Sequence, residues 1–112
     1  MPTDPTTPLS GLEYHLLLAV ARGPLHGYAI RDAVEHDSEG ALSPRAGSLY
    51  RVIARLTSAG WLRETEGPDE GPHPGRERRY YGLTPQGREV LRDEAARWRG
   101  AVALAERRLG RP

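Results

Sequence analysis

The residues of this chain that are best suited to chemistry lie in one stretch, 42–62, which reads LSPRAGSLYRVIARLTSAGWL. At about 100° per residue, Leu49, Ile53 and Leu56 fall on one side of a helix. Tyr50 lies on the flank of that side. The opposite side carries small, hydroxyl and basic side chains, namely Gly47, Ser48, Arg51, Arg55 and Ser58. The pattern predicts a helix with one buried face and one basic face.

A basic helical face of this kind is suited to nucleic acid. Residues 43–63 contain four Arg and neither Asp nor Glu. Guanidinium groups, hydroxyls and the free amides of a helix N-terminus bind phosphates and base edges. An ordinary amphipathic helix with a solvated basic face explains this stretch equally well when it is taken alone.

Small residues mark the ends of this helix. Ser43 and Pro44 break the chain before it, and the small residues Gly47 and Ser48 follow as candidate caps for exposed amides. Gly60 ends the helix, and the residue after it is placed to fold back as the hydrophobic contact of a Schellman-type cap.

The composition favours one small domain without cysteine chemistry. The chain has 112 residues, 38% of them hydrophobic, and no cysteine. Disulfides, thiolate zinc sites and cysteine nucleophiles are therefore excluded. The net charge is only +1, but acids dominate before residue 43 and arginines after it. All 16 basic residues are Arg, a skew that GC-rich coding explains for the most part.

No catalytic constellation is found in the sequence. No two histidines have the close spacing of a metal-binding pair; the histidines are His15, His26, His36 and His73. A Gly-rich phosphate loop and a nucleophile elbow are both absent. We therefore expect neither an enzyme nor a cofactor nor a metal site.

The sequence also lacks membrane signals. No apolar run approaches the ~20 residues of a membrane span. The N-terminal MPTDPTTPL has neither the basic nor the apolar region of a signal peptide. We expect residues 1–9 to be a disordered arm and the protein to have no membrane partner.

Two helices are predicted before the basic one. Ser10 and Glu13 form a capping-box pair that starts a helix over 11–22. Its wide apolar stripe fits a central core helix, and it fits equally a helix that also meets a second subunit through Leu16.

The next segment completes a helix-turn-helix order. Gly27 is expected to cap a second helix that runs to about Asp37, and Ala41–Leu42 are expected to form one short strand. Helix, helix, turn and helix is the order of a helix-turn-helix domain, in which the third element is the reader.

Two strands with an irregular loop follow the basic helix. Strands are predicted at 61–66 and 78–83. The loop between them, GPDEGPHPGRE, is too rich in Pro and Gly for a regular element and carries acids that dilute its charge. Such a hairpin is a wing, and its candidates for phosphate contacts are Arg76, Arg78 and Arg79.

The last stretch predicts a long helix suited to pairing. Thr84 and Pro85 supply an N-cap and a first-turn proline for a helix over 84–109. Apolar residues at alternating spacings of four and three form a heptad seam, consisting of Leu91, Ala95, Trp98, Val102, Ala105 and Leu109. We favour dimerisation through this seam over intramolecular packing. Trp98 is either an anchor of the dimer, which we prefer, or a platform for a planar ligand.

Three blocks of the chain resemble, in order and spacing, the PadR-like winged-helix transcriptional regulators: GPLHGYAI, LSPRAGSLYRVIARLTSAGWL and RRYYGLTPQGREVL. The resemblance covers Leu16 to about Arg92. It implies a homodimeric bacterial protein of repressor type on a two-fold operator, similar to the short subfamily with a single dimerising helix. Some short members bind flat aromatic compounds between such helices.

The resemblance also assigns roles to residues. Ser48, Tyr50 and Arg51 match positions that meet DNA on the reader helix. Pro44 and Gly47 match the turn that sets its angle.

Further matches and departures accompany these roles. Tyr28, in the block that opens the second helix, matches a residue that touches a phosphate or only packs. Arg51 stands where family members often carry Pro, and the wing loop is longer and more acidic than in the family.

Together these observations predict a mainly α fold with a small β-hairpin. We expect a winged helix-turn-helix domain over 10–83 and a C-terminal dimerisation helix over 84–109. The predicted function is a sequence-specific DNA-binding regulator of repressor type. It would act as a homodimer on a palindromic operator in the cytoplasm, on the nucleoid, with a small aromatic molecule as candidate effector. The alternative, favoured by the near-neutral charge, is a winged-helix or ligand-binding module without strong DNA affinity.

Overall fold

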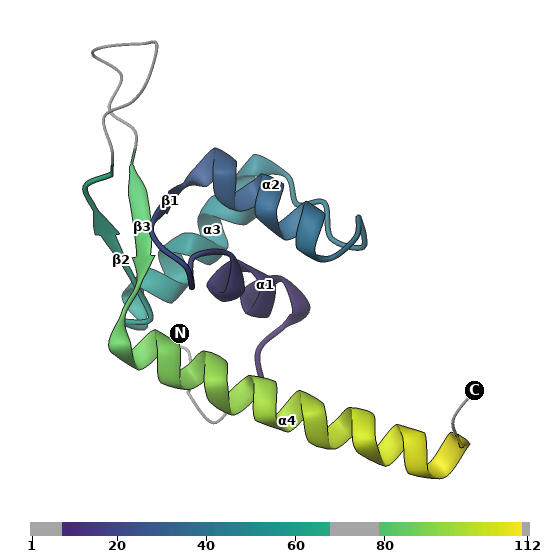
Figure 1. Ribbon diagram of the computed structural model, residues 1–112. Coiled ribbons are helices and arrows are strands. Elements are labelled where there is room, and N and C mark those ends of the chain that lie inside the picture. Colours follow the sequence, from purple (N-terminus) through teal and green to yellow (C-terminus); the bar gives the residue numbers. More distant parts are fainter. Residues whose placement is uncertain (1–7, 68–78, 111–112) are drawn as a thin grey trace.

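The computed structural model describes residues 8–67 and 79–110. Figure 1 shows the helices before the last one clustered together, the strands along one side of the cluster, and the last helix passing beneath it and projecting beyond it. The predicted mainly α fold with a small β-hairpin and a C-terminal helix is confirmed. In chain order the elements are α1 (Gly11–Ala19), β1 (Leu25–His26), α2 (Gly27–Asp37), α3 (Ala46–Ser58), β2 (Leu62–Thr65), β3 (Tyr80–Leu83) and α4 (Pro85–Leu109).

The strands form one antiparallel sheet in the order β1-β3-β2. Leu62 lies opposite Leu83 across β2 and β3, which confirms the predicted hairpin. β1 joins the other edge, with Leu25 opposite Tyr81. The sequence does not predict β1, because a two-residue strand shows no alternation of polar and apolar side chains.

The strand predicted at Ala41–Leu42 is wrong. These residues follow α2 without joining the sheet. The backbone N–H of Leu42 donates to Ser38 Oγ at 3.0 Å. A short polar side chain that satisfies the backbone locally competes with strand pairing.

One hydrophobic core lies between the helices and the sheet. Its most buried members come from α1 and its C-cap, from α2 and α3, and from the start of β2 with the residue before it. They are Leu16, Leu17, Val20, Ile30, Val34, Leu49, Leu56, Trp61 and Leu62. The apolar side predicted for the basic helix therefore faces inward.

Two residues predicted at a dimer interface belong to this core. Leu16 is 0% exposed and Leu91 is 9% exposed within the single protomer. Their side chains have almost no surface left for a second subunit. The interface prediction is corrected at both positions.

The predicted starts of α1 and α2 are largely confirmed. In the capping box of α1, Glu13 N–H donates to Ser10 Oγ at 3.1 Å and Ser10 N–H donates to Glu13 Oε1 at 2.8 Å. The cap of α2 is His26 rather than Gly27, since His26 Nδ1 accepts from Ala29 N–H at 3.2 Å. The predicted cap at Gly27 is therefore wrong by one residue, because the imidazole of His26 caps the helix.

The starts of α4 and α3 differ from each other. Thr84 caps α4 as predicted, with its hydroxyl oxygen accepting from Gly87 N–H at 2.9 Å. The N-cap of α3 is Arg45, which makes no side-chain cap hydrogen bond. Gly47 and Ser48 lie inside the helix, so their predicted capping role is wrong.

The helix ends are set by turns. α1 ends at Ala19, three residues before the predicted end, because the chain turns there and Gly23 N–H donates to the Val20 carbonyl at 3.2 Å. The end of α3 is as predicted. Gly60 has φ 83°, and Trp61 N–H donates to the Leu56 carbonyl at 3.0 Å in a Schellman arrangement.

A junction ties the end of α3 to the start of α4. Thr84 Oγ1 donates to the Gly60 carbonyl at 2.6 Å. Thr84 N–H donates to the Trp61 carbonyl at 3.1 Å. The two ends of the hairpin are thereby held together at its base.

Candidate nucleic-acid interface

α3 presents the predicted basic face at the surface. Every residue predicted on that face is exposed, as is the flanking tyrosine: Gly47, Ser48, Tyr50, Arg51, Arg55 and Ser58. Pro44, just before the helix, is half-buried. The fold thus brings the predicted reader residues together on one surface.

Arg51 lies over the first turn of α3. A Cβ atom added at Gly47 would be 4.0 Å from Arg51 Nη2, because helical side chains point back toward the helix N-terminus. Among the described residues Arg51 forms no ion pair, and the first turn holds no acid and no side-chain cap. Free amides, a positive helix end and an unpaired guanidinium meet here, which suits an anion.

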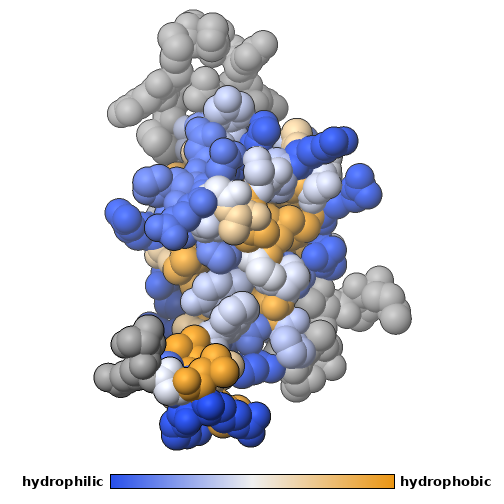
Figure 2. All heavy atoms as spheres, turned by 90° about the vertical axis from the view of Figure 1, so that its right-hand side faces the viewer, coloured by the Kyte–Doolittle hydropathy of each residue, from blue (hydrophilic) through white to orange (hydrophobic). Residues whose placement is uncertain are grey.

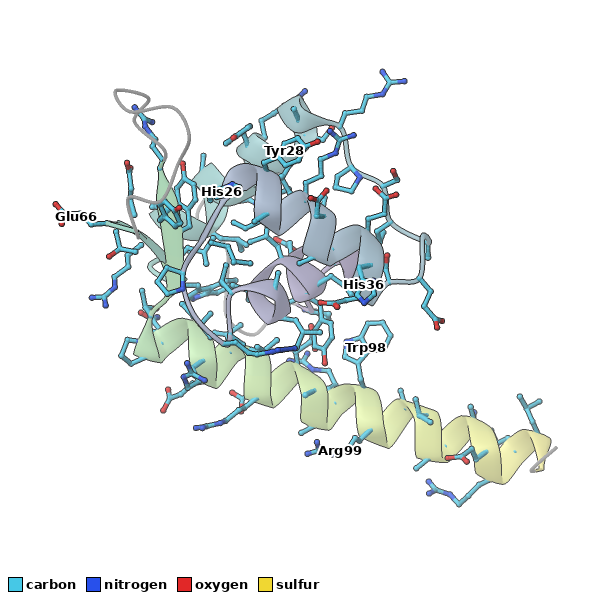
Figure 3. All side chains as sticks on the ribbon, turned by 45° about the horizontal axis from the view of Figure 1, so that its top comes forward. His26, Tyr28, His36, Glu66, Trp98 and Arg99 are labelled. Atoms are coloured by element: carbon cyan, nitrogen blue, oxygen red, sulfur yellow. The ribbon has the colours of Figure 1, made fainter. Side chains whose placement is uncertain are left out.

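Tyr50 leans on the start of α2. A Cβ atom added at Gly27 would be 2.4 Å from Tyr50 Oη, so the bare glycine makes room for the ring. Figure 3 shows Tyr28 at the start of α2, beside His26. Tyr28 is 67% exposed and Tyr50 is 50% exposed. Tyrosines from two helices therefore reach the surface near the start of α2.

Arg55 is held by an acidic side chain of α1. Its Nε and Nη2 donate to Glu13 Oε2 at 3.2 and 3.0 Å. The exposed fraction is 44% for the Arg55 side chain and 10% for that of Glu13. Sequence reasoning recognises Glu13 only as a cap, because no sequence pattern links two residues on different helices.

Of the three wing arginines, Arg76 and Arg78 lie outside the described residues. Arg79 is exposed, and its Nε lies 3.6 Å from Glu64 Oε1 on the neighbouring strand. Because both side chains are more than half exposed, this ion pair is weak. Burial, and secondly the Glu64 carboxylate, raise the pKa of Tyr81 in the same sheet.

The second half of α4 carries an exposed apolar surface. The exposed fractions are 48% for Trp98, 54% for Val102 and 84% for Leu109. Ala105 is also exposed, whereas Ala95 is half-buried. Figure 2 shows hydrophobic residues gathered where this end of α4 projects. The outer part of the predicted seam is therefore left uncovered by the protomer's own core.

A gap of about 240 Å³ opens beside Trp98, between α4 and the segment before α1. The ring of Tyr14 lies 5.8 Å from that of Trp98, tilted by 34°. The residues that line the gap are Pro8, Leu9, Glu94, Arg97, Trp98 and Ala101.

Glu94 is a buried carboxylate at this gap, 2% exposed. It accepts from the backbone N–H of Leu9 and lies 3.0 Å from Arg97 Nε. Glu94 is not among the site residues predicted from the sequence. Its spacing, three residues after Leu91 and four before Trp98, is the signal that places it on the inward face of α4.

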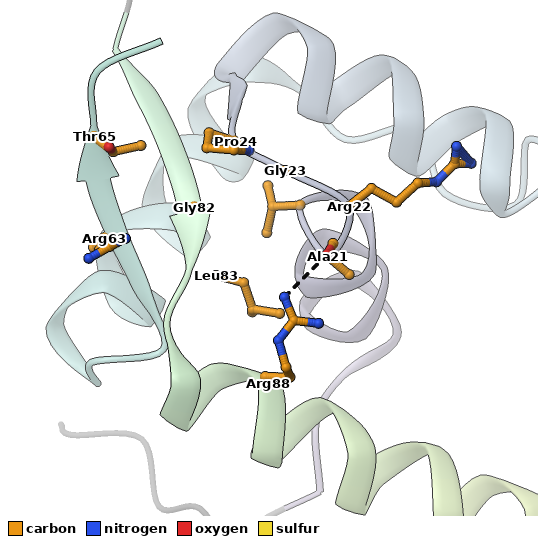
Figure 4. Close-up of a pocket in the computed structure, with 10 residues that line it drawn as sticks. Ala21, Arg22, Gly23, Pro24, Arg63, Thr65, Gly82, Leu83 and Arg88 are labelled. Atoms are coloured by element: carbon orange, nitrogen blue, oxygen red, sulfur yellow. Dashed lines mark hydrogen bonds between the residues drawn. The ribbon is translucent and has the colours of Figure 1, made fainter.

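A second hollow, of about 180 Å³, has three arginines among its lining residues, Arg22, Arg63 and Arg88. Figure 4 shows Arg88 pointing toward the Ala21 carbonyl, to which its Nη2 donates at 3.3 Å, while Arg22 extends away. Arg88 is thus hydrogen-bonded to the protein itself and Arg22 points away, so we do not assign a ligand to this hollow.

The described residues show no metal centre. They contain no group of three or more His, Asp or Glu side chains that could hold an ion. Across the same part of the chain, no helix is both long enough and apolar enough to cross a bilayer. The surfaces of α3 and α4 remain as the principal candidates for function.

The sequence is similar to known proteins over most of its length. A profile of the transcriptional regulator PadR-like family matches residues 16–93. An uncharacterized 37.1 kDa protein in transposon TN4556 of Streptomyces fradiae is 46% identical over 80 residues, which are 71% of this chain and 21% of that protein. The chain therefore spans about a fifth of the length of this curated relative.

Solved structures share the fold. A PadR family transcription regulator from Clostridium difficile R20291 matches with TM-score 0.73 at 20% identity, over 90% of this chain and 100% of that one. Smu.1704 from Streptococcus mutans UA159 matches with TM-score 0.69 at 27% identity, over 96% of each chain. Bacillus subtilis PadR in complex with operator DNA matches with TM-score 0.63 at 24% identity, over 75% of this chain and 46% of that one. Because the profile matches well over half of its residues, the chain belongs to the transcriptional regulator PadR-like family.

Proposed function

We propose that this protein is a DNA-binding transcriptional regulator that reads a specific operator with α3. The observation that carries the proposal is the uncapped N-terminus of α3 with Arg51 lying over it. The other described helices, α1, α2 and α4, each have a side chain that accepts from a first-turn amide. The amides left free on α3 are suited to a phosphate. The solved complex of the similar protein Bacillus subtilis PadR with operator DNA supports DNA as the partner.

The roles of the α3 residues follow from their positions. Side chains near the start of a reader helix contact base edges in the major groove, which makes Arg51 the main candidate for base reading. Ser48 and Tyr50 contact the DNA backbone and so position the helix on the duplex. Pro44 and Gly47 set the angle at which the helix meets the groove. Tyr28 contacts a phosphate from the start of α2.

Two copies pair through α4 and place two α3 helices on a palindromic operator. An exposed Trp98, Val102 and Leu109 favour burial against another apolar surface. A two-fold pair uses the same surface from both chains. Such a dimer binds two half-sites whose centres lie one helical turn of DNA, or a multiple of it, apart. Repression by occupation of the operator, on the nucleoid in the cytoplasm, completes the proposal.

A small planar aromatic molecule is the effector that the gap beside Trp98 suits. Trp98 lines a gap of about 240 Å³, and the ring of Tyr14 lies 5.8 Å from the ring of Trp98. Ring faces bind planar molecules by stacking. The competing role of Trp98 is to anchor the dimer. Fluorescence titration with planar dyes separates the two roles, with Trp98→Phe as the control that isolates the signal of buried Trp61.

A winged-helix module without strong DNA affinity is the second candidate. The ion pairs of Arg55 with Glu13 and of Arg79 with Glu64 favour it, because they neutralise part of the basic charge. A salt series distinguishes the two candidates. The affinity of a DNA-binding protein falls steeply with salt in proportion to the phosphates it contacts.

Selection of bound DNA from a random double-stranded pool tests the proposal. The parent protein is expected to enrich one palindromic sequence, and Arg51→Ala is expected to lose that enrichment. Arg107→Ala removes a basic residue from the last turn of α4, at the other end of the molecule. This matched control is expected to enrich the same sequence as the parent. A parent that enriches nothing would leave the second candidate as the function.

A further inference from the structure

Two acidic side chains are buried among the described residues, Glu13 and Glu94. A buried carboxylate is unfavourable unless it is paired and hydrogen-bonded, and each of these two is paired with an arginine. The partner of Glu94 is Arg97, one turn away on its own helix. The partner of Glu13 is Arg55, on the outward face of a different helix.

The two carboxylate oxygens of Glu13 accept hydrogen bonds from different partners. Oε1 accepts from Ser10 N–H at 2.8 Å and so belongs to the cap of α1. Oε2 accepts from Arg55 Nε at 3.2 Å and from Nη2 at 3.0 Å. The capping box thus fixes the carboxylate, and the fixed carboxylate in turn orients the guanidinium.

Although Arg55 is paired with Glu13, its side chain remains accessible to solvent. Its side chain is 44% exposed, and among the described residues its Nη1 has no hydrogen-bond partner. Arg55 lies one helical turn after Arg51 on the same face. The Nη1 edge is therefore left available at the surface that Arg51 shares.

We propose that Glu13 is a positioning residue for operator binding: it orients Arg55 so that the free Nη1 edge contacts the DNA backbone while α3 lies in the groove. This inference rests on the proposed function of α3. Arg55 belongs to the last turn of α3, where a backbone contact fixes the register of the helix without reading a base.

The expected effect of Glu13 separates specific from non-specific binding. An arginine held in place loses less side-chain entropy when it binds than a free one does. Loss of the Glu13 charge frees Arg55, whereas the negative charge that it removes close to the DNA changes the attraction to operator and to random DNA alike. The ratio of operator affinity to random-DNA affinity therefore falls by about three- to tenfold.

Glu13→Gln is the test variant, because glutamine supports the same capping box and removes only the charge. Glu89→Gln is the control, since it makes the same change at an exposed carboxylate of α4. Arg55→Lys is the second variant, which keeps the charge and loses the fork. It disturbs an exposed side chain and reports on the orientation of Arg55 even where Glu13→Gln folds poorly.

The affinities for the selected operator and for random DNA are measured for each variant and for Glu13→Gln in an Arg55→Ala background. The proposal expects a lower ratio in Glu13→Gln and in Arg55→Lys, a parent-like ratio in Glu89→Gln, and no further fall in the Arg55→Ala background. A parent-like ratio in Glu13→Gln and Arg55→Lys, or an equal fall without Arg55, overturns it. A parent that does not discriminate operator from random DNA overturns the proposed function and this inference with it.

Discussion

Gly87, in the first turn of α4, lies directly against the backbone carbonyl of Trp61: a Cβ atom added at Gly87 would be 2.1 Å from that oxygen. Trp61 is 1% exposed and follows the glycine that ends α3. The same carbonyl accepts a hydrogen bond from Thr84 N–H at 3.1 Å. The approach of α4 to the end of α3 therefore depends on the absence of a side chain at position 87.

Gly87→Ala is expected to destabilise the protein by about 1–3 kcal/mol, the usual cost of overpacking a filled site. Gly100→Ala is the matched control in the same helix. No atom lies within 4 Å of a Cβ at Gly100, so alanine there stabilises the helix by up to ~1 kcal/mol. Thermal unfolding of the two variants should shift in opposite directions. A shift of Gly87→Ala toward higher stability would contradict the packing described for Trp61.

Gly27→Ala is expected to move the reader tyrosine without unfolding the protein. The added Cβ would be 2.4 Å from Tyr50 Oη, and the half-exposed ring is able to swing outward. Operator affinity should fall, while the melting temperature changes little because the displaced group is a side chain at the surface. The control is the same change in a Tyr50→Ala background. A further loss of affinity in that background would show that Gly27 acts through something other than Tyr50.

Much of this fold is predictable because its signals are local. The capping box of Ser10 and the glycine stop at Gly60 each involve residues within a few positions of one another, and both are confirmed. β1 escapes prediction because a strand of two residues, Leu25–His26, depends wholly on its partner β3. The cap of α2 escapes because histidine is not among the preferred capping residues.

The exposed basic face of the candidate site is predictable from the sequence, whereas the ion pair of Arg55 with Glu13 is not. Helical periodicity alone places Arg51 and Arg55 on one exposed face. Only the packing of α1 against the rest of the domain brings Glu13 to Arg55. Packing of the same kind buries Leu16 in the core of the single chain, since a wide apolar stripe does not indicate which of its sides meets the core.

Arg51→Ala is expected to weaken operator binding by about 1–3 kcal/mol if the lost contact reads a base. Arg51→Lys keeps the charge but lacks the planar fork, so it should recover affinity for random DNA and not discrimination between bases. Binding titrations at several salt concentrations measure both effects. Arg92→Ala, which removes an exposed arginine of α4, serves as the control. An Arg51→Ala protein with the operator affinity of the parent would remove Arg51 from the reading surface.

Val102→Glu is expected to convert a dimer into a folded monomer. Val102 is 54% exposed within the protomer, so a charge there leaves the core intact. In a two-fold pair the same change brings two carboxylates into an apolar interface, where an unpaired charge is strongly unfavourable. Sedimentation should report the monomer, and circular dichroism should report an unchanged helix content.

The control for Val102→Glu is Ala96→Glu, an exposed position on α4 that lies off the seam. It adds the same charge to the same helix and is expected to leave the dimer intact. If the monomeric Val102→Glu protein binds a single half-site weakly and loses the palindrome, pairing through α4 sets the spacing of the two α3 helices. Equal mass for the parent, Val102→Glu and Ala96→Glu would instead show that the exposed seam is not where two copies meet.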